Sequence, residues 1–155
     1  MKRDEHRGGR GFTLVELIVT ITVLAILAGL AMPLARNSIR RQQEVELRRA
    51  LREMRVAIDR YKEAADLGLI EVTQDSGGYP PSLEVLVEGV DLTSAEGGKL
   101  RFLRRIPVDP TTNAPNWGSR SSMDSPGLSG GSQNVFDVYS RSDGVALDGT
   151  RYSDW

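Results

Sequence analysis

The strongest constraint in this 155-residue sequence is an apolar stretch without charges that runs directly into a charged helix. Residues 17–35 contain no Asp, Glu, Lys or Arg and are rich in Leu, Ile, Val and Ala. As a helix with a rise of about 1.5 Å per residue, this stretch would be roughly 28 Å long, close to the hydrocarbon thickness of a bilayer. The direct prediction is therefore a single membrane-spanning helix.

The alternative is a secretory signal peptide that is removed from the mature protein. The stretch is long for the apolar part of such a peptide, and no small-x-small cleavage site precedes Arg36. Basic residues stand on both sides of it. The positive-inside rule therefore gives only a weak preference for a cytoplasmic N-terminus.

The net charge of -1 is a cancellation between two unlike halves. Residues 1–66 hold 13 basic and 9 acidic side chains (+4), and residues 67–155 hold 7 and 12 (-5). This balance excludes a chain that is basic throughout, as many nucleic-acid-binding proteins are.

The sequence lacks the residues that several catalytic mechanisms need. There is no cysteine, which excludes disulfides, thiolate metal sites and a cysteine nucleophile, and His6 is the only histidine. Asp109, Asp137 and Asp143 could in principle act as acid–base pairs, but no nucleophile or base constellation accompanies them. We therefore predict that the chain is not an enzyme.

A second helical pattern follows the apolar stretch, between about residues 36 and 67. Apolar residues recur there at spacings of 4, 3, 4, 3 and 4, at Leu47, Leu51, Met54, Ile58, Tyr61 and Ala65. The other faces carry mixed charges, several at salt-bridge spacing: Arg48, Arg52, Glu53, Arg55, Asp59 and Glu63. This predicts an amphipathic stem that packs on the rest of the domain and ends at a Gly68 cap.

From Gly68 onward the pattern becomes that of a small mixed domain. Residues 79–86 predict a turn and a short helix capped by Ser82, and residues 135–139 predict a strand. The longest predicted loop runs from Asn113 to Asn134.

Glu16 stands at the start of the apolar helix, in the sequence Gly11-Phe12-Thr13-Leu14-Val15-Glu16-Leu17. A lone glutamate there could simply favour the positive end of the helix dipole. However, this motif behind a short charged leader resembles the class III signal of type IV pilins and pseudopilins. The resemblance implies that prepilin peptidase cuts between Gly11 and Phe12 and methylates the Phe12 amine. It also implies that Glu16 pairs with the Phe12 amine of a neighbouring subunit.

The head sharpens this resemblance through Ile106-Pro107-Val108-Asp109-Pro110, Trp117-Gly118, the segment 134–140 and Ser142-Asp143-Gly144. Together these resemble the major pseudopilins of type II secretion systems, the G protein family. The implied fold is α+β and type IV pilin-like, with a long N-terminal helix on a small antiparallel sheet and a calcium-binding C-terminal loop. The expected regions are a leader (1–11), a membrane or filament-core half (12–35), a stem (36–67) and a head (68–155) whose loop region is 107–155.

Three aspartates, Asp143, Asp148 and Asp154, lie in one twelve-residue stretch of the Gly- and Ser-rich tail and are candidate calcium ligands. An EF-hand is excluded, because its third and fifth positions would be Val145 and Leu147. From spacing alone, Asp143-Gly144 and Asp148-Gly149 could be tight turns. The family resemblance instead implies a Ca²⁺ site formed by the three aspartates, with a further backbone carbonyl near Ser140.

The resemblance implies a structural subunit of a periplasmic filament that pushes folded proteins through an outer-membrane secretin. The chain would cross the bacterial inner membrane once, with its head in the periplasm. Implied partners are copies of the chain, minor pseudopilins, prepilin peptidase and the inner-membrane secretion platform. The resemblance implies no nucleic-acid partner. Two alternatives stay open: a type IV pilus subunit for adhesion, motility or DNA uptake, and a membrane-anchored periplasmic binding module.

Overall fold

The structure is a computed structural model that describes residues 11–73, 76–94, 97–124 and 133–155. The chain forms two compact units, Met1–Ile39 and Arg40–Trp155. Residues 1–10, which make up most of the predicted leader and include His6, lie outside the described residues.

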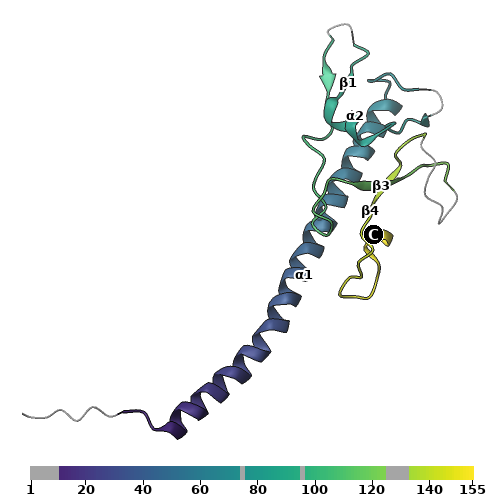
Figure 1. Ribbon diagram of the computed structural model, residues 1–155. Helices are drawn as coiled ribbons and strands as arrows, with labels where there is room; N and C mark the ends of the chain where they lie inside the picture. Colours follow the sequence, from purple (N-terminus) through teal and green to yellow (C-terminus); the bar gives the residue numbers. More distant parts are fainter. Residues whose placement is uncertain (1–10, 74–75, 95–96, 125–132) are drawn as a thin grey trace, which may run out of the picture. The chain divides into compact units, whose positions relative to one another are not determined.

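Helix α1 (Leu14–Asp66) supplies secondary structure to both units (Figure 1). It begins after Thr13, whose Oγ1 accepts a hydrogen bond from the Glu16 backbone N–H at 3.2 Å. The helix continues through Gly29 and Pro33, although proline removes one backbone donor from the helix. Among the described residues, no helix is both long and apolar enough to cross a membrane.

The C-terminal end of α1 closes as predicted at Gly68. The Gly68 N–H donates to the Ala65 carbonyl at 3.0 Å, and the Leu69 N–H donates to the Ala64 carbonyl at 2.9 Å. Gly68 has φ = 67°, a left-handed conformation that glycine adopts without steric penalty. This pair of hydrogen bonds is a Schellman motif, which satisfies carbonyls at the end of the stem.

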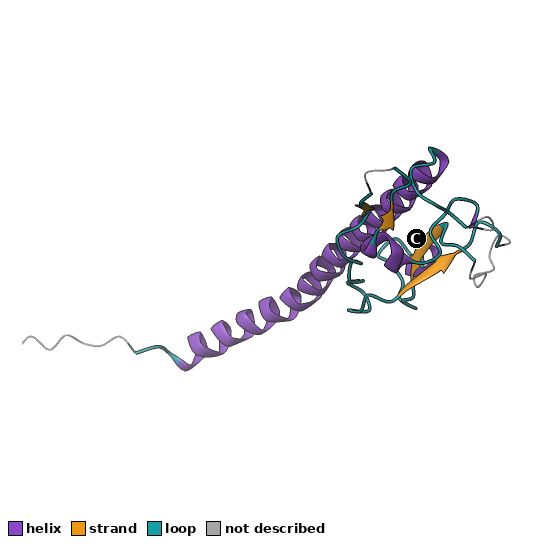
Figure 2. Cartoon of the chain, turned by 90° about the horizontal axis from the view of Figure 1, so that it is seen from above, coloured by secondary structure: helices purple, strands orange, loops and turns teal. Residues whose placement is uncertain are grey.

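The second unit adds short elements to the C-terminal part of α1 (Figure 2). They are α2 (Leu83–Glu88), β1 (Val90–Asp91), β2 (Lys99–Leu100), β3 (Trp117–Arg120), β4 (Asp137–Ser140) and the 3-10 helix η2 (Tyr152–Asp154). Strands β1 and β2 form one antiparallel pair, and β3 and β4 form another. A long N-terminal helix with small antiparallel sheets confirms the predicted α+β, pilin-like fold class.

Two local predictions need correction. The predicted loop from Asn113 to Asn134 contains β3, which the sequence pattern did not reveal because Trp117 is the only apolar residue of this strand. Gly118 pairs with Tyr139 across the sheet, and a Cβ at Gly118 would lie 2.2 Å from the Tyr139 ring. Ser82 does precede α2, but its side chain makes no capping hydrogen bond.

The core of the second unit lies along the predicted apolar stripe of the stem. Its fully buried side chains include Leu47, Leu51, Met54, Ile58 and Tyr61, which are at most 3% exposed. Three alanines beside the stripe are also buried, at Ala50, Ala57 and Ala64. The head covers this face with residues from α2, β3, β4 and the tail, among them Leu86, Trp117, Val138, Ala146 and Tyr152.

Candidate functional site

The predicted processing motif lies in a short non-helical segment and the first turn of α1. Gly11 and Phe12 precede the helix, and Phe12 is 78% exposed. Thr13 and Glu16 form one half of a capping box, since Thr13 accepts the Glu16 backbone N–H. The Thr-x-x-Glu spacing could have predicted this cap. The Glu16 carboxylate makes no hydrogen bond or ion pair with any residue that the structure describes.

The helix surface on both sides of Glu16 is apolar all round. Large apolar side chains there each expose at least 50% of their surface: Leu14, Val15, Leu17, Ile18, Val19, Ile21, Val23, Leu24, Ile26 and Leu27. The hydroxyl groups of Thr20 and Thr22 donate back to the Glu16 and Ile18 carbonyls at 2.6 and 2.7 Å. The side chains of this segment therefore have few polar groups without a hydrogen-bond partner. This is typical of helices that are covered by lipid or by other helices.

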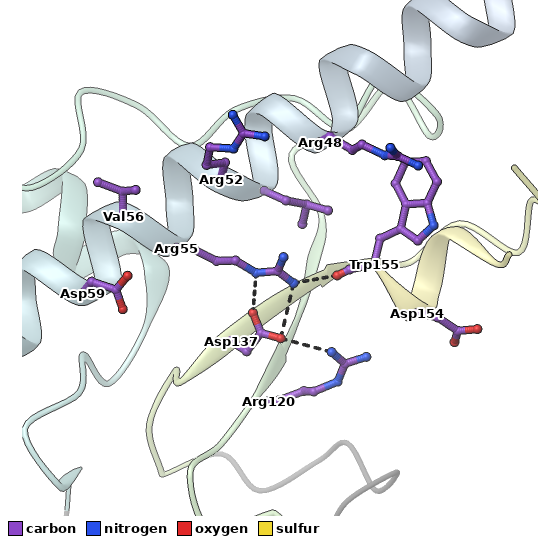
Figure 3. A pocket seen from close by; sticks show the side chains of 10 residues that line it. Arg48, Arg52, Arg55, Val56, Asp59, Arg120, Asp137, Asp154 and Trp155 are labelled. Carbon is purple, nitrogen blue, oxygen red and sulfur yellow. Dashed lines mark hydrogen bonds and ion pairs between the residues drawn. The ribbon is translucent and has the colours of Figure 1, made fainter. Parts of the chain in front are cut away.

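A second candidate site lies where the C-terminal tail meets the stem (Figure 3). Arg55 Nε donates to Asp137 Oδ1 at 2.7 Å, and Arg55 Nη2 donates to the Val138 and Trp155 carbonyls at 3.1 and 2.6 Å. Arg120 Nη1 donates to Asp137 Oδ2 at 3.1 Å, and its Nη2 donates to the Ser153 carbonyl at 3.1 Å. One half-buried carboxylate thus lies between two guanidinium groups that also hold tail carbonyls.

Arg48 lies about two helical turns before Arg55 on α1 and also contacts the tail. Its guanidinium carbon lies 4.2 Å from the centre of the Trp155 ring, and its Nη2 donates to Asp148 Oδ2 at 3.3 Å. Asp148 Oδ1 also accepts the Thr150 hydroxyl at 2.6 Å and the Thr150 backbone N–H at 2.9 Å. These Thr150 hydrogen bonds, with a smaller contribution from Arg48, lower the pKa of Asp148.

Glu44 binds the tail at Leu147 and at Tyr152. Its Oε1 accepts the Leu147 backbone N–H at 2.7 Å and the Tyr152 hydroxyl at 3.3 Å. Burial raises the pKa of Tyr152, and the negative charge of Glu44 raises it further. The tail is therefore attached to α1 at Glu44, Arg48 and Arg55, which lie at near-helical spacing on one side of the stem.

The predicted calcium ligands are dispersed rather than gathered. No group of three acidic, His or Cys side chains in the described ranges could hold a metal ion, and Asp143, Asp148 and Asp154 all lie within those ranges. Asp148 belongs to a turn with Thr150, and Figure 3 shows Asp154 pointing away from the arginines. The buried Ser140 donates its hydroxyl to Asp109 Oδ2 at 2.5 Å. As folded, the three carboxylates do not fit one calcium site. Calcium binding by the chain stays a prediction.

Sequence reasoning missed the tail contacts of the stem arginines. It placed Arg48, Arg52 and Arg55 among charges that pair along the helix. The described residues contain one ion pair within the stem, between Lys62 and Asp66, whereas Arg48 and Arg55 pair with residues about 100 and 82 positions later. No local signal distinguishes the two kinds of pairing. The acidic candidates Asp109 and Asp137 are likewise occupied, by Thr111 and Ser140 and by the two arginines respectively.

Comparison with known proteins gives consistent matches. Residues 6–32 match the family model described as the prokaryotic N-terminal methylation motif. The chain is 30% identical to the type II secretion system core protein G of Klebsiella pneumoniae, over 94% of each chain. It is 30% identical to the Escherichia coli K12 protein of that name, over 78% of this chain and 75% of the relative. The Pseudomonas aeruginosa protein of the same name is 28% identical, over 88% of this chain and 84% of its own length.

No solved structure matches the chain at a significant level. The full-length similarity, the methylation motif and the pilin-like architecture nevertheless agree with one another. They confirm the family resemblance that the sequence carries in its N-terminal motif and its head. The chain belongs to the family of type II secretion system core protein G.

Proposed function

We propose that this chain is the major structural subunit of a type II secretion pseudopilus and has no catalytic role. The observation that carries the proposal is the exposed apolar helix surface that starts directly behind Phe12, around Glu16. Such a surface requires a cover of lipid or neighbouring helices. The relatives, all named core protein G, favour a secretion pseudopilus over the two alternatives, a type IV pilus and a solitary binding module.

Before assembly, the apolar part of α1 would anchor the subunit in the inner membrane with the head in the periplasm. Residues 17–35 carry no charge, and their length as a helix is close to the bilayer thickness. The basic residues of the leader favour a cytoplasmic N-terminus, where prepilin peptidase would cut between Gly11 and Phe12. The exposed position of Phe12 leaves this bond accessible.

Assembly would replace lipid by neighbouring helices. Cleavage creates a cationic amine on Phe12, and Glu16 supplies a carboxylate without a partner among the described residues. Pairing between two subunits would relieve both charges where the dielectric constant is low. Contacts of this kind do not close on themselves, so they extend into a filament. Minor pseudopilins and the inner-membrane platform would begin and drive this assembly.

The processing step provides the test. The full chain is coexpressed with an active prepilin peptidase, extracted from membranes and measured by intact-mass spectrometry. We expect a chain that starts at N-methylated Phe12 and lacks residues 1–11. Gly11→Leu should remain uncut, whereas Gly8→Ala, a matched change inside the leader, should be processed normally. An intact Met1 chain beside a control pseudopilin that is fully processed would contradict the proposal.

A further inference from the structure

We propose that the C-terminal tail of this chain is held on α1 by an arginine–aspartate clamp, and that the head folds without a calcium ion. The clamp consists of Arg55, Asp137 and Arg120 together with the Ser153 and Trp155 carbonyl oxygens that the arginines bind. It performs the stabilising role that the family resemblance assigns to calcium. The proposal concerns the stability of the head and is independent of the role of Glu16 in assembly.

Several oxygens of the tail already have partners. Calcium requires six to eight oxygen ligands. Both carboxylate oxygens of Asp148 accept hydrogen bonds, from Thr150 and Arg48. The Ser153 and Trp155 carbonyls accept from Arg120 and Arg55. A metal ion could recruit these oxygens only by displacing partners that the protein itself provides.

The charge of the groove between stem and tail also opposes a metal ion. Four arginines line it (Arg48, Arg52, Arg55 and Arg120) against three acids (Asp59, Asp137 and Asp154), and Asp137 already pairs with two of the arginines. Repulsion between a dication and nearby guanidinium groups opposes metal binding at this place. The three predicted ligands, Asp143, Asp148 and Asp154, do not gather to offset that repulsion.

Arg55 itself performs the structural task of a bound cation. Its guanidinium group is permanently charged and offers several donors in a fixed plane. It connects α1 to the Asp137 carboxylate, to the Val138 carbonyl in β4 and to the Trp155 carbonyl in the tail. One cation thereby joins three segments through oxygen atoms, which is what a structural calcium ion does.

The experiment measures tail release in the full chain in detergent micelles. Trypsin can cut the tail after the exposed residues Arg141 and Arg151, and the rate of release is followed by mass spectrometry. Thermal unfolding by near-ultraviolet circular dichroism reports on the whole head. Both are measured with millimolar CaCl₂ and with excess EGTA. We expect the cleavage rate and the Tm of the unaltered chain to be the same in both conditions.

Three variants separate the clamp from a metal site. Asp137→Asn should speed tail cleavage severalfold and lower the Tm by about 5 °C or more, with no rescue by calcium. Arg120→Gln is a milder change that keeps the Arg55–Asp137 pair, so it keeps the test informative if Asp137→Asn does not fold. It should speed cleavage by a smaller factor. Asp143→Asn, which removes the predicted metal ligand closest to the family pattern, should change neither quantity.

Two results would overturn the proposal. One is a clear rise in the Tm of the unaltered chain with calcium that Asp143→Asn abolishes, because this is the behaviour of a metal-stabilised tail. The other is an unchanged tail cleavage rate in both Asp137→Asn and Arg120→Gln, because the clamp would then contribute nothing to holding the tail.

Discussion

Arg55 Nε donates to Asp137 Oδ1 at 2.7 Å, so that the C-terminal part of α1 is joined to β4 across 82 positions of sequence. The same arginine reaches the Trp155 carbonyl 100 positions away. The Asp137 side chain is 24% exposed and the Arg55 side chain is 41% exposed, so the pair is only partly screened by solvent. This relationship places the last residues of the chain on the stem.

Replacing Arg55 should destabilise the head. Arg55→Met keeps much of the apolar stem of the side chain but removes hydrogen bonds to one carboxylate and two carbonyls. We expect the free energy of unfolding in urea to fall by about 2 kcal/mol. Arg52→Met is the matched control, because Arg52 makes no hydrogen bond or ion pair with the described residues. It should change stability by less than about 0.5 kcal/mol; equal losses in both variants would contradict a specific role for Arg55.

The apolar stripe of the stem should be sensitive to truncation at its centre. Met54 is fully buried against the head, so Met54→Ala leaves a cavity and should cost about 2–5 kcal/mol. Val56, two residues later on the same helix, is 42% exposed, and Val56→Ala should cost under about 1 kcal/mol. Urea unfolding of both variants checks the difference. Similar losses would mean that the stem does not bury the predicted face.

Gly118 should tolerate no side chain while Tyr139 stays in place. In Gly118→Ala the new Cβ would lie 2.2–2.6 Å from carbons of the Tyr139 ring, so either the ring must leave its position over Gly118 or β3 and β4 must separate locally. We expect a loss of at least about 2 kcal/mol in urea unfolding. The double variant Gly118→Ala/Tyr139→Ser removes the clash and should recover part of that loss relative to Tyr139→Ser alone. An additive double variant would show that the ring is not the cause.

Acid should loosen the tail through Asp148. Hydrogen bonds from Thr150 lower the pKa of this exposed carboxyl below its ordinary value of 3.8 in the folded chain. A lowered folded pKa means that stabilisation is complete above pH 3.8 and is lost as the pH falls through the folded pKa. Hydrogen–deuterium exchange of the 145–151 segment should therefore rise at low pH. Thr150→Val should reduce the acid-dependent part of that rise, and an unchanged profile would contradict the assignment.

Glu16 should be needed for assembly and not for anchoring. Glu16→Gln retains shape and removes the charge that would pair with the Phe12 amine, so membrane-extracted subunits should be normal in amount while filaments are absent. Glu46→Gln, an exposed stem residue, is the matched control and should assemble. Electron microscopy of sheared filaments from overexpressing cells provides the measurement. Normal filaments from Glu16→Gln would remove the role assigned to this carboxylate.

The sequence by itself determined the features that depend on neighbours along the chain. The stripe from Leu47 to Tyr61 and the Schellman end at Gly68 follow from helical periodicity and from the conformational freedom of glycine, and both are confirmed. The N-terminal motif around Gly11 and Glu16 identified the family because it is contiguous, and the comparisons confirm that family.

Only the tertiary structure decided how the tail is held. The spacing of Asp143, Asp148 and Asp154 permitted a common ligand set, but the folded loop directs them to different surroundings. The partners of Arg48 and Arg55 lie about 100 and 82 residues away, and β3 was found only through its pairing with β4. A helical period records which side of a stem is buried. It does not predict which distant carboxylate pairs with an arginine of the stem, because that pairing depends on how the chain reverses direction in the head.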